Sequence, residues 1–288
     1  MTLCEKIKSG KFIITSEIAP PKGVNVKELL DDASLLRDRV DAINVTDLQS
    51  SVMRAGSMAI CRLLKDRGIE PILQMTCRDR NRLALQSDLL SASILGINNV
   101  LLLTGDYTTS GDHPEAKPVF DLGSVQLLEV AATLQSGKDM KGNALNGAPQ
   151  FCVGAVVNPG ADPLEPEIIR MEKKMLAGAQ FFQTQVVYDI DIFKRFLDST
   201  RHLKTTILAG IVPLKSAGMA RFMNKNVAGV CVPEDLIQEM EAAKDKVSKS
   251  IEISARIISG LKPLCNGVHI MPIGWDKKVP LLLDAAGL

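Results

Sequence analysis

The sequence predicts an α/β protein whose whole length, residues 1–288, forms one (β/α)8 barrel domain with its active site at the C-terminal ends of the strands. Three observations favour this fold. Eight apolar segments of β-forming composition are spread over the chain, helical stretches lie between most of them, and the strand segments end at polar or acidic residues beside Pro or Gly. The length of 288 residues suits one such barrel, and a hydrophobic content of 46% suffices for a full core.

The eight predicted strands share apolar, β-branched or aromatic residues and a polar terminus. They are FIITSEIAPP at 12–21, AINVTD at 42–47, PILQMTC at 71–77, VLLLTGD at 100–106, FCVGAVVNPG at 151–160, AQFFQTQVV at 179–187, TILAGIVP at 206–213 and GVHIMPIG at 267–274. In a parallel barrel all C-terminal strand ends meet at one face. The polar residues at these ends are the first candidates for a functional site: Glu17, Thr46, Gln74, Asp106, Asn158 and Gln185.

Helical periodicity alternates with these strands. Segments 26–39, 57–68 and 82–96 place Leu and Ala on one side and charges on the other, and the latter two end at glycine, a common C-terminal signal. Further helices are predicted over 121–137, 166–179 and 189–202. We expect all six to cover the outside of the barrel.

The last third of the chain departs from this regular pattern. Segment 216–229 predicts a helix, and 233–263 predicts one or two more, so the helical layer after the seventh strand should be unusually thick. Two long polar loops interrupt the alternation elsewhere. Loop 107–120 follows the fourth strand and is expected at the catalytic face, whereas loop 138–149 is expected at the opposite face.

The charge balance argues against nucleic acid and membranes as partners. Lys and Arg number 34 against 33 Asp and Glu, a net charge of +1, and no long basic run is present. The N-terminal segment lacks the apolar stretch of a signal peptide, and no run of roughly 18 apolar residues is available to span a bilayer. We therefore expect a cytoplasmic protein with a small-molecule ligand.

No metal site is predicted. The cysteines lie far apart without a CxxC or a Cys/His cluster, and the three histidines are isolated along the chain. In a reducing cytoplasm the six cysteines should be free thiols, most of them serving as small core residues.

Three strand-end residues stand out for their chemistry. Glu17 precedes Pro20 and Pro21, which stiffen the turn; it is either a solvated residue at the barrel rim or a general acid. Asp106 follows a glycine and is either a turn former or a fixed charge in the site. Gln185 either caps the sixth strand or offers its amide to a ligand.

Motifs at the strand ends follow one another in order over essentially the entire chain. They are SEIAPPKG, NVTD, LQMTCRDRN, LLLTGD, the Asn-Pro turn after the fifth strand, AGAQFFQTQVVYD, AGIVP and VHIMP. This series resembles the methylenetetrahydrofolate reductase family, the flavin-dependent enzymes of one-carbon metabolism, in a short form without an appended regulatory domain. The resemblance implies interconversion of 5,10-methylenetetrahydrofolate and 5-methyltetrahydrofolate by hydride transfer at flavin N5.

The resemblance also implies roles for single residues. Glu17 corresponds to the general acid that protonates the departing N10 as the folate ring opens to an iminium. Asp106 corresponds to the aspartate whose fixed charge favours that cation and disfavours an anionic reduced flavin. Gln185 corresponds to the glutamine that holds the pterin.

The implied cofactor is noncovalent FAD rather than FMN, bound without a Rossmann fingerprint because no G-x-G-x-x-G is present. Arg170 and Lys174 stand four apart on one predicted helical face, which is either solvated or placed to meet the diphosphate. The implied cofactor contacts are Thr46, Gln74, Gly105, Asp106, Asn158, Arg170 and Lys174.

The chain departs from the family pattern at three places. Thr104 replaces an Arg before the Gly-Asp pair, Asn158 replaces a Tyr before Pro159, and segment 214–218, LKSAG, contains no aromatic residue. Few aromatics remain to stack a nicotinamide, so electrons are expected to come through a partner subunit of a homo- or hetero-oligomer rather than directly from NAD(P)H.

Two other functions remain open at the level of sequence. One is a pterin-binding barrel that transfers a methyl group without a flavin. The other is a folate-binding subunit of a larger one-carbon complex that has no activity of its own. The colour of the purified protein separates the first from a reductase, and reoxidation of reduced flavin by methylenetetrahydrofolate separates the second.

Overall fold

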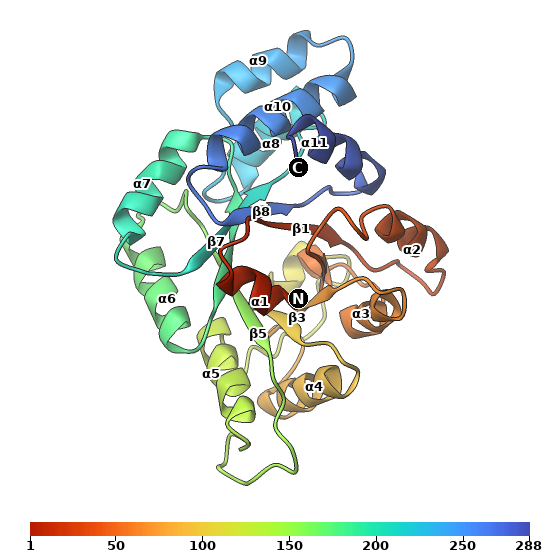
Figure 1. Cartoon of the computed structure of the whole chain (residues 1–288), viewed down its shortest axis with the longest axis vertical. Coiled ribbons are helices and arrows are strands. Elements are labelled where there is room, and N and C mark those ends of the chain that lie inside the picture. Colours follow the sequence, from red (N-terminus) through yellow and green to blue (C-terminus); the bar gives the residue numbers. More distant parts are fainter.

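The computed structural model describes residues 1–288, and a closed barrel of eight parallel strands in sequence order forms its centre (Figure 1). The strands are β1 (Ile13–Ile18), β2 (Ala42–Val45), β3 (Pro71–Thr76), β4 (Asn99–Leu103), β5 (Cys152–Val157), β6 (Phe181–Val186), β7 (Thr206–Ile211) and β8 (Gly267–Ile270). The barrel closes where β1 pairs with β8, with Thr15 opposite His269. The predicted (β/α)8 fold is confirmed, and each predicted strand segment overlaps one observed strand, with β4 beginning one residue before its predicted segment.

Alternate side chains of the strands fill the barrel interior in layers. The layer nearest the N-terminal strand ends is apolar and consists of Ile13, Ala42, Ile72, Leu101, Cys152, Phe181 and Leu208. The Phe181 ring fits because Gly154 pairs with it on β5, where an added Cβ would lie 2.3 Å from the ring. This apolar layer excludes water from the barrel interior at the N-terminal end of the strands.

A polar layer lies above the apolar one. Its members are Thr15, Asn44, Gln183 and His269, all at most 3% exposed and linked to one another by hydrogen bonds. Burial of polar groups is tolerated only when they are paired. The interior therefore becomes hydrogen-bonding just below the face where the strands end.

Glu17 and Gln74 lie above the polar layer at the C-terminal face, whereas the side chains on the other side of each strand face outward and pack against the helices. These are α2 (Lys27–Ser34), α3 (Ser57–Asp66), α4 (Arg82–Ile94), α5 (Ser124–Gln135), α6 (Glu165–Leu176), α7 (Ile190–Thr200), α8 (Ala217–Asn226), α9 (Glu234–Ala242) and α10 (Lys246–Leu261). Side-chain caps fix several starts: Asn81, Asp189 and Asp245 each accept from backbone N–H groups of the following turn. The predicted helices are confirmed within a few residues at each end.

The thick helical layer after β7 is also confirmed. The predicted segment 233–263 forms two helices, α9 and α10, which lie with α8 and α11 (Val279–Ala285) at the top of Figure 1. Asp245 begins α10 by accepting from Val247 and Ser248 N–H groups, so the chain turns between α9 and α10 instead of continuing as one helix.

Helix α1 (Leu3–Lys8) was not predicted from the sequence, nor was α11. Thr2 and Glu5 form a capping box that starts α1, and Leu3 is 1% exposed because it packs on the apolar layer of the barrel. Figure 1 shows α1 lying across the near end of the barrel. The helix therefore plugs the N-terminal end.

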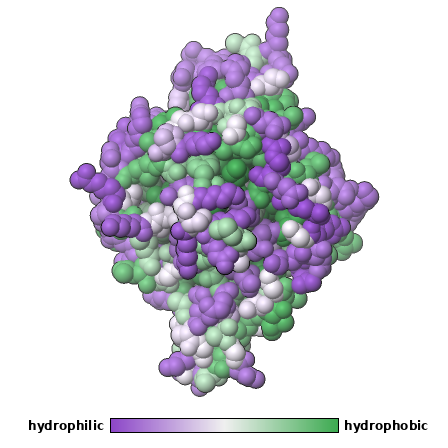
Figure 2. All heavy atoms as spheres, viewed as in Figure 1, coloured by the Kyte–Doolittle hydropathy of each residue, from purple (hydrophilic) through white to green (hydrophobic).

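The two long loops lie where the order of elements requires. Loop 107–120 follows β4 at the C-terminal face, where Val119 N–H donates to Arg78 O and Met53 N–H donates to Asp112. Loop 138–149 precedes β5 at the opposite face. No helix of the structure is both long and apolar enough to cross a bilayer. Hydrophilic side chains dominate the surface in the view of Figure 2, with hydrophobic ones visible between them.

Candidate active site

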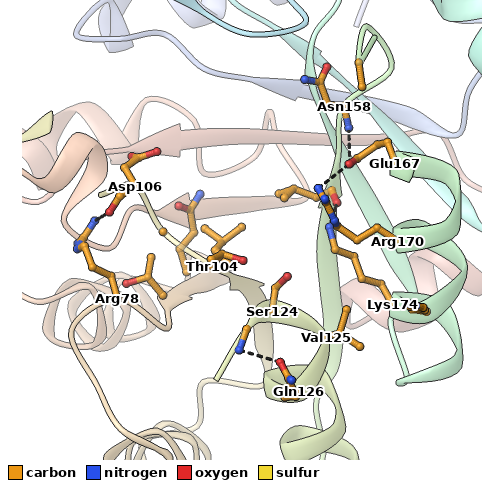
Figure 3. Close-up of a pocket in the computed structure, with 18 of the residues that line it drawn as sticks. Arg78, Thr104, Asp106, Ser124, Val125, Gln126, Asn158, Glu167, Arg170 and Lys174 are labelled. Carbon is orange, nitrogen blue, oxygen red and sulfur yellow. Dashed lines mark hydrogen bonds and ion pairs between the residues drawn. The ribbon is translucent and has the colours of Figure 1, made fainter. Parts of the chain in front are cut away.

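Two cavities open at the C-terminal face of the barrel, and Gln49 lines both of them. The larger, about 1120 Å³, lies beyond β3, β4 and β5 and extends to the start of α5 and the side of α6. Figure 3 shows Asp106 and Arg78 on one side of it and Arg170 and Lys174 on the other. The smaller cavity, about 550 Å³, lies beyond β1 and beside the loop after β8.

Glu17 is the penultimate residue of β1 and lines the smaller cavity. Its side chain is largely buried, and Gln74 Nε2 donates to Oε2 over 3.0 Å. Gln49 Nε2 lies 3.4 Å from Oε1, and His269 Nε2 lies 3.6 Å from Oε2. A carboxyl group that lines a cavity and is held by amides is suited to proton transfer to a ligand.

The smaller cavity is acidic. Besides Glu17 it is lined by Glu28, Asp32 and Asp276, with Arg54 as its cation. Burial raises the pKa of Asp276, and the nearby charges of Asp32 and Glu17 raise it further. Arg54 donates to the carbonyl oxygen of Pro20, and Lys277 pairs with Glu28 and lies 3.7 Å from Asp32. The carboxylates outnumber these two cations, so the cavity keeps a negative character.

Asp106 lies at the turn after β4, where Gly105 adopts φ +94 and packs against Thr76. Its carboxylate accepts from Ser50 N–H over 3.1 Å, and its carbonyl accepts from the buried guanidinium of Arg78. The side chain is exposed to the larger cavity. Asp106 thus presents a fixed charge whose backbone is held by its neighbours.

The acidic residue buried at the end of β2 is Asp47. It accepts from both the N–H and the hydroxyl of Thr76, at 2.9 Å each, and from Arg80 through both of its oxygens. The neighbouring Thr46 lines neither cavity, and its Oγ1 is buried without a hydrogen-bond partner. In this structure the Thr46 hydroxyl is therefore not placed to contact a ligand in either cavity.

Helix α6 contributes cations to the larger cavity. Lys174 is 4% exposed, and its Nζ donates to Val156 O over 2.6 Å. Burial lowers the pKa of Lys174 to about 8; Glu167 opposes this shift, and Arg170 adds to it. Arg170 is exposed and pairs with Glu167 over 2.9 Å. Lys173 also lines this wall, which is therefore suited to an anionic group.

The other predicted residues are placed differently. Gln74 lines the larger cavity and Gly105 does so through the turn before Asp106. Asn158 lines it too, but its side-chain amide donates to Ala228 O, so the side chain turns toward the loop between α8 and α9. Gln185 lines neither cavity, and its Oε1 accepts from Val186 N–H at a register shift of β6.

Sequence reasoning missed several residues that the structure brings to the site. Asp47 and His269 stand within NVTD and VHIMP, so the signal was present at these strand ends. Gln49 and the first turn of α5 carry no such signal. No group of three or more His, Cys, Asp or Glu residues could hold a metal ion, and all six cysteines are free.

The chain is similar to known reductases. The family model described as methylenetetrahydrofolate reductase matches residues 2–287. Methylenetetrahydrofolate reductase 2 of Schizosaccharomyces pombe is 27% identical over 99% of this chain, and the chain spans 47% of that protein. The 5,10-methylenetetrahydrofolate reductase of Buchnera aphidicola subsp. Baizongia pistaciae is 25% identical over 81% of this chain and 74% of its own length.

A solved structure has the same fold along its whole length. It is an uncharacterised protein from Clostridium thermocellum that binds two copies of 5-methyl-5,6,7,8-tetrahydrofolic acid. Its TM-score is 0.68 at 19% identity, covering 99% of this chain and 97% of that one. At this identity the likeness concerns the fold. On the match of the family model to residues 2–287, the chain belongs to the methylenetetrahydrofolate reductase family.

Proposed function

We propose that the protein is a flavin-dependent methylenetetrahydrofolate reductase that interconverts 5,10-methylenetetrahydrofolate and 5-methyltetrahydrofolate. The observation that carries this proposal is the position of Glu17. Its largely buried carboxyl group lines the smaller, acidic cavity, and the amides of Gln74 and Gln49 that contact it line the larger cavity, which is bordered by cations. A ligand in the smaller cavity can therefore reach the carboxyl group directly, and a cofactor in the larger cavity would lie beside the amides that hold it.

The larger cavity has the features that a flavin dinucleotide requires. Its volume of about 1120 Å³ exceeds that of a typical small-ligand pocket. Arg170 and Lys173 offer exposed cations for a diphosphate, and Lys174 becomes available once it gives up Val156 O. Three cations on one wall favour FAD over FMN, because a diphosphate accepts more charge-assisted hydrogen bonds than a single phosphate.

The bound flavin supplies the hydride. The protein supplies the proton and the electrostatic environment. Glu17, held by Gln74, gives its proton to folate N10 while the C–N10 bond breaks and its electron pair stays on nitrogen. The carboxylate of Asp106 stabilises the positive charge that develops on the one-carbon unit. Gln185 offers both a donor and an acceptor to the pterin amide once it releases Val186 N–H.

A folate ligand agrees with the C. thermocellum neighbour, whose ligand is 5-methyltetrahydrofolic acid. For electrons we propose a partner subunit as donor, with NAD(P)H at most a poor direct reductant. The segment 214–218 supports this proposal, because its Lys215 packs over Trp275 with Nζ 5.4 Å from the ring centre, and no aromatic side chain of the segment is available for a nicotinamide.

A visible spectrum followed by anaerobic half-reactions tests the function. We expect flavin absorption bands in the purified protein and rapid reoxidation of the photoreduced protein by methylenetetrahydrofolate. Colourless protein that binds methyltetrahydrofolate would instead favour a methyl-transferring barrel. Flavin-containing protein that binds folate without being reoxidised by it would favour a non-catalytic subunit.

A further inference from the structure

A chain of buried polar side chains crosses the barrel interior and ends at Glu17. Asn44 and Gln183 exchange two amide hydrogen bonds, of 2.8 and 3.1 Å. Gln183 Nε2 also lies 3.3 Å from Thr15 Oγ1, and Thr15 Oγ1 lies 3.0 Å from His269 Nδ1. His269 Nε2 then faces Glu17 Oε2 at 3.6 Å. The first four residues line neither of the two cavities, so this series of side chains approaches Glu17 from the barrel interior.

The hydrogen bonds along this series of side chains run in one direction. Gln183 Nε2 donates both to Asn44 Oδ1 and to Thr15 Oγ1. The Thr15 hydroxyl then has two acceptors, His269 Nδ1 at 3.0 Å and Val268 O at 3.5 Å, and the nearer is favoured. With Nδ1 accepting, neutral His269 carries its proton on Nε2, the nitrogen that faces Glu17.

The two oxygens of Glu17 are held unequally. Oε2 faces two donors, Gln74 Nε2 at 3.0 Å and His269 Nε2 at 3.6 Å. Oε1 faces only Gln49 Nε2, at 3.4 Å, and Gln49 lines both cavities. The contact to His269 is long here, as catalytic hydrogen bonds often are before a ligand tightens the site.

We propose that His269 is a positioning residue that, with Gln74, anchors Oε2 of Glu17 and leaves Oε1 as the oxygen that delivers the proton. This inference rests on the proposed reductase function. The proton on Oε1 passes to folate N10 as the C–N10 bond breaks, the bonding pair remains on N10, and Glu17 is left as a carboxylate. His269 itself neither gains nor loses a proton in this step.

Two substitutions of His269 distinguish the roles of its two ring nitrogens. His269→Asn keeps a group near Thr15 but cannot reach Glu17, whereas His269→Gln extends an amide N–H toward the position of Nε2. We expect His269→Asn to slow flavin reoxidation by methylenetetrahydrofolate about tenfold, a usual effect of losing an orienting partner, and His269→Gln to restore most of the rate. Flavin content and photoreduction should be unchanged in both.

His202→Asn is the matched control. His202 also contacts a glutamate, Glu172 at 2.9 Å, but it is exposed on the outer surface. Its substitution should leave reoxidation unchanged. Thr15→Val provides a second route to the same question, because it removes the hydroxyl that holds the proton on Nε2 while the contacts of Glu17 remain. It too should slow reoxidation.

A double-mutant cycle gives the decisive result. If His269 acts through Glu17, then His269→Asn causes no further loss in a Glu17→Gln background. Three results would each overturn the positioning role. The effects of the two substitutions on the reoxidation rate could multiply, folded His269→Asn could be reoxidised at the wild-type rate, or His269→Gln could be reoxidised no faster than His269→Asn. If Glu17→Gln alone leaves reoxidation unchanged, Glu17 is not the general acid and the positioning role of His269 falls with it. If methylenetetrahydrofolate fails to reoxidise the wild-type flavin, the reductase function itself fails, which is a different outcome.

Discussion

At the scale of single residues, Glu17 carries the strongest prediction. Glu17→Gln keeps the size and the hydrogen-bonding reach of the side chain but removes the transferable proton. Flavin binding and photoreduction should survive, whereas reoxidation by methylenetetrahydrofolate should fall by about 10²-fold or more, the usual weight of a positioned general acid. Anaerobic stopped-flow measurement of the flavin band checks this, and reoxidation near the wild-type rate would remove Glu17 from the chemistry.

Asp106 should behave differently from Glu17. Asp106→Asn removes a negative charge that opposes an anionic reduced flavin, so the flavin reduction potential should rise while turnover of methylenetetrahydrofolate falls. Glu17→Gln serves as the comparison, because it should leave the potential nearly unchanged. A spectroscopic redox titration of both variants distinguishes them, and equal potentials in wild type and Asp106→Asn would place Asp106 away from the cofactor.

The lowered pKa of buried Lys174 leads us to expect that the stability of the protein depends on pH. Burial lowers its pKa to about 8 in the folded protein, from an ordinary 10.5. Between these values the unfolded chain binds more protons, so the free energy of unfolding should rise as the pH rises from 8 toward 10, by about 3 kcal/mol in all. The destabilisation that comes from burying the charged form of Lys174 is fully present below pH 8.

Denaturant unfolding at pH 7.5 to 9.5 checks this prediction in flavin-free protein. Lys174→Met is the matched variant, since it keeps the buried chain without the charge. The difference in unfolding free energy between the two proteins should shrink as the pH rises, and a difference that is independent of pH would contradict the assignment. Other groups titrate equally in both proteins and cancel.

At the scale of elements, α1 is the piece that closes the N-terminal end of the barrel. Leu3 packs there against the apolar layer formed by the strands. Leu3→Ala should lower the free energy of unfolding by roughly 2–4 kcal/mol, because the buried isopropyl group of Leu3 is lost and a cavity is left. Leu176→Ala is the control, since Leu176 is 89% exposed on α6.

Urea denaturation of both variants checks this prediction. A loss below about 0.5 kcal/mol for Leu3→Ala would show that α1 detaches before the barrel unfolds, so that its packing does not contribute to global stability. Reoxidation by methylenetetrahydrofolate should be unaffected under conditions where the protein is folded, because α1 lies at the end of the barrel opposite the strand C-termini.

The loop after β2 shows how an element shapes the site. Leu48, Ser50 and Ser51 all have positive φ, a conformation that costs energy in non-glycine residues. The bonds that hold this loop come from Asp106 and Arg78. The strain lies beside Gln49, which lines both cavities, and the loops after β2, β3 and β4 therefore position Gln49 together.

At the scale of the whole molecule, the source of electrons is the open question with a direct test. NADH or NADPH should reduce the flavin of the isolated protein slowly, since segment 214–218 has no aromatic side chain and its Lys215 is engaged with Trp275. Anaerobic stopped-flow mixing measures this rate, with photoreduction as the positive control. Rapid bleaching by either nucleotide would contradict the proposed partner subunit.

The barrel and the face that carries the site were predictable from the amino-acid sequence alone. Periods of 2 and 3.6 report burial over a few neighbouring residues, which is local information. The eight strands, the helices from 26–39 to 233–263 and the side of each long loop were therefore predictable. The motifs at strand ends also indicated the family, since they mark where loops must present polar groups.

The polar residues that face a ligand, and the pairs they form, depend on contacts made in three dimensions. Thr15 and His269 are 254 residues apart and meet because the barrel closes. Asp47 lines the larger cavity while Thr46 does not, and Asn158 turns toward the loop after α8. Lys174 is buried, whereas the sequence left its helical face either solvated or placed to meet a diphosphate. Side-chain direction and partners depend on strand register and closure, which no local pattern contains.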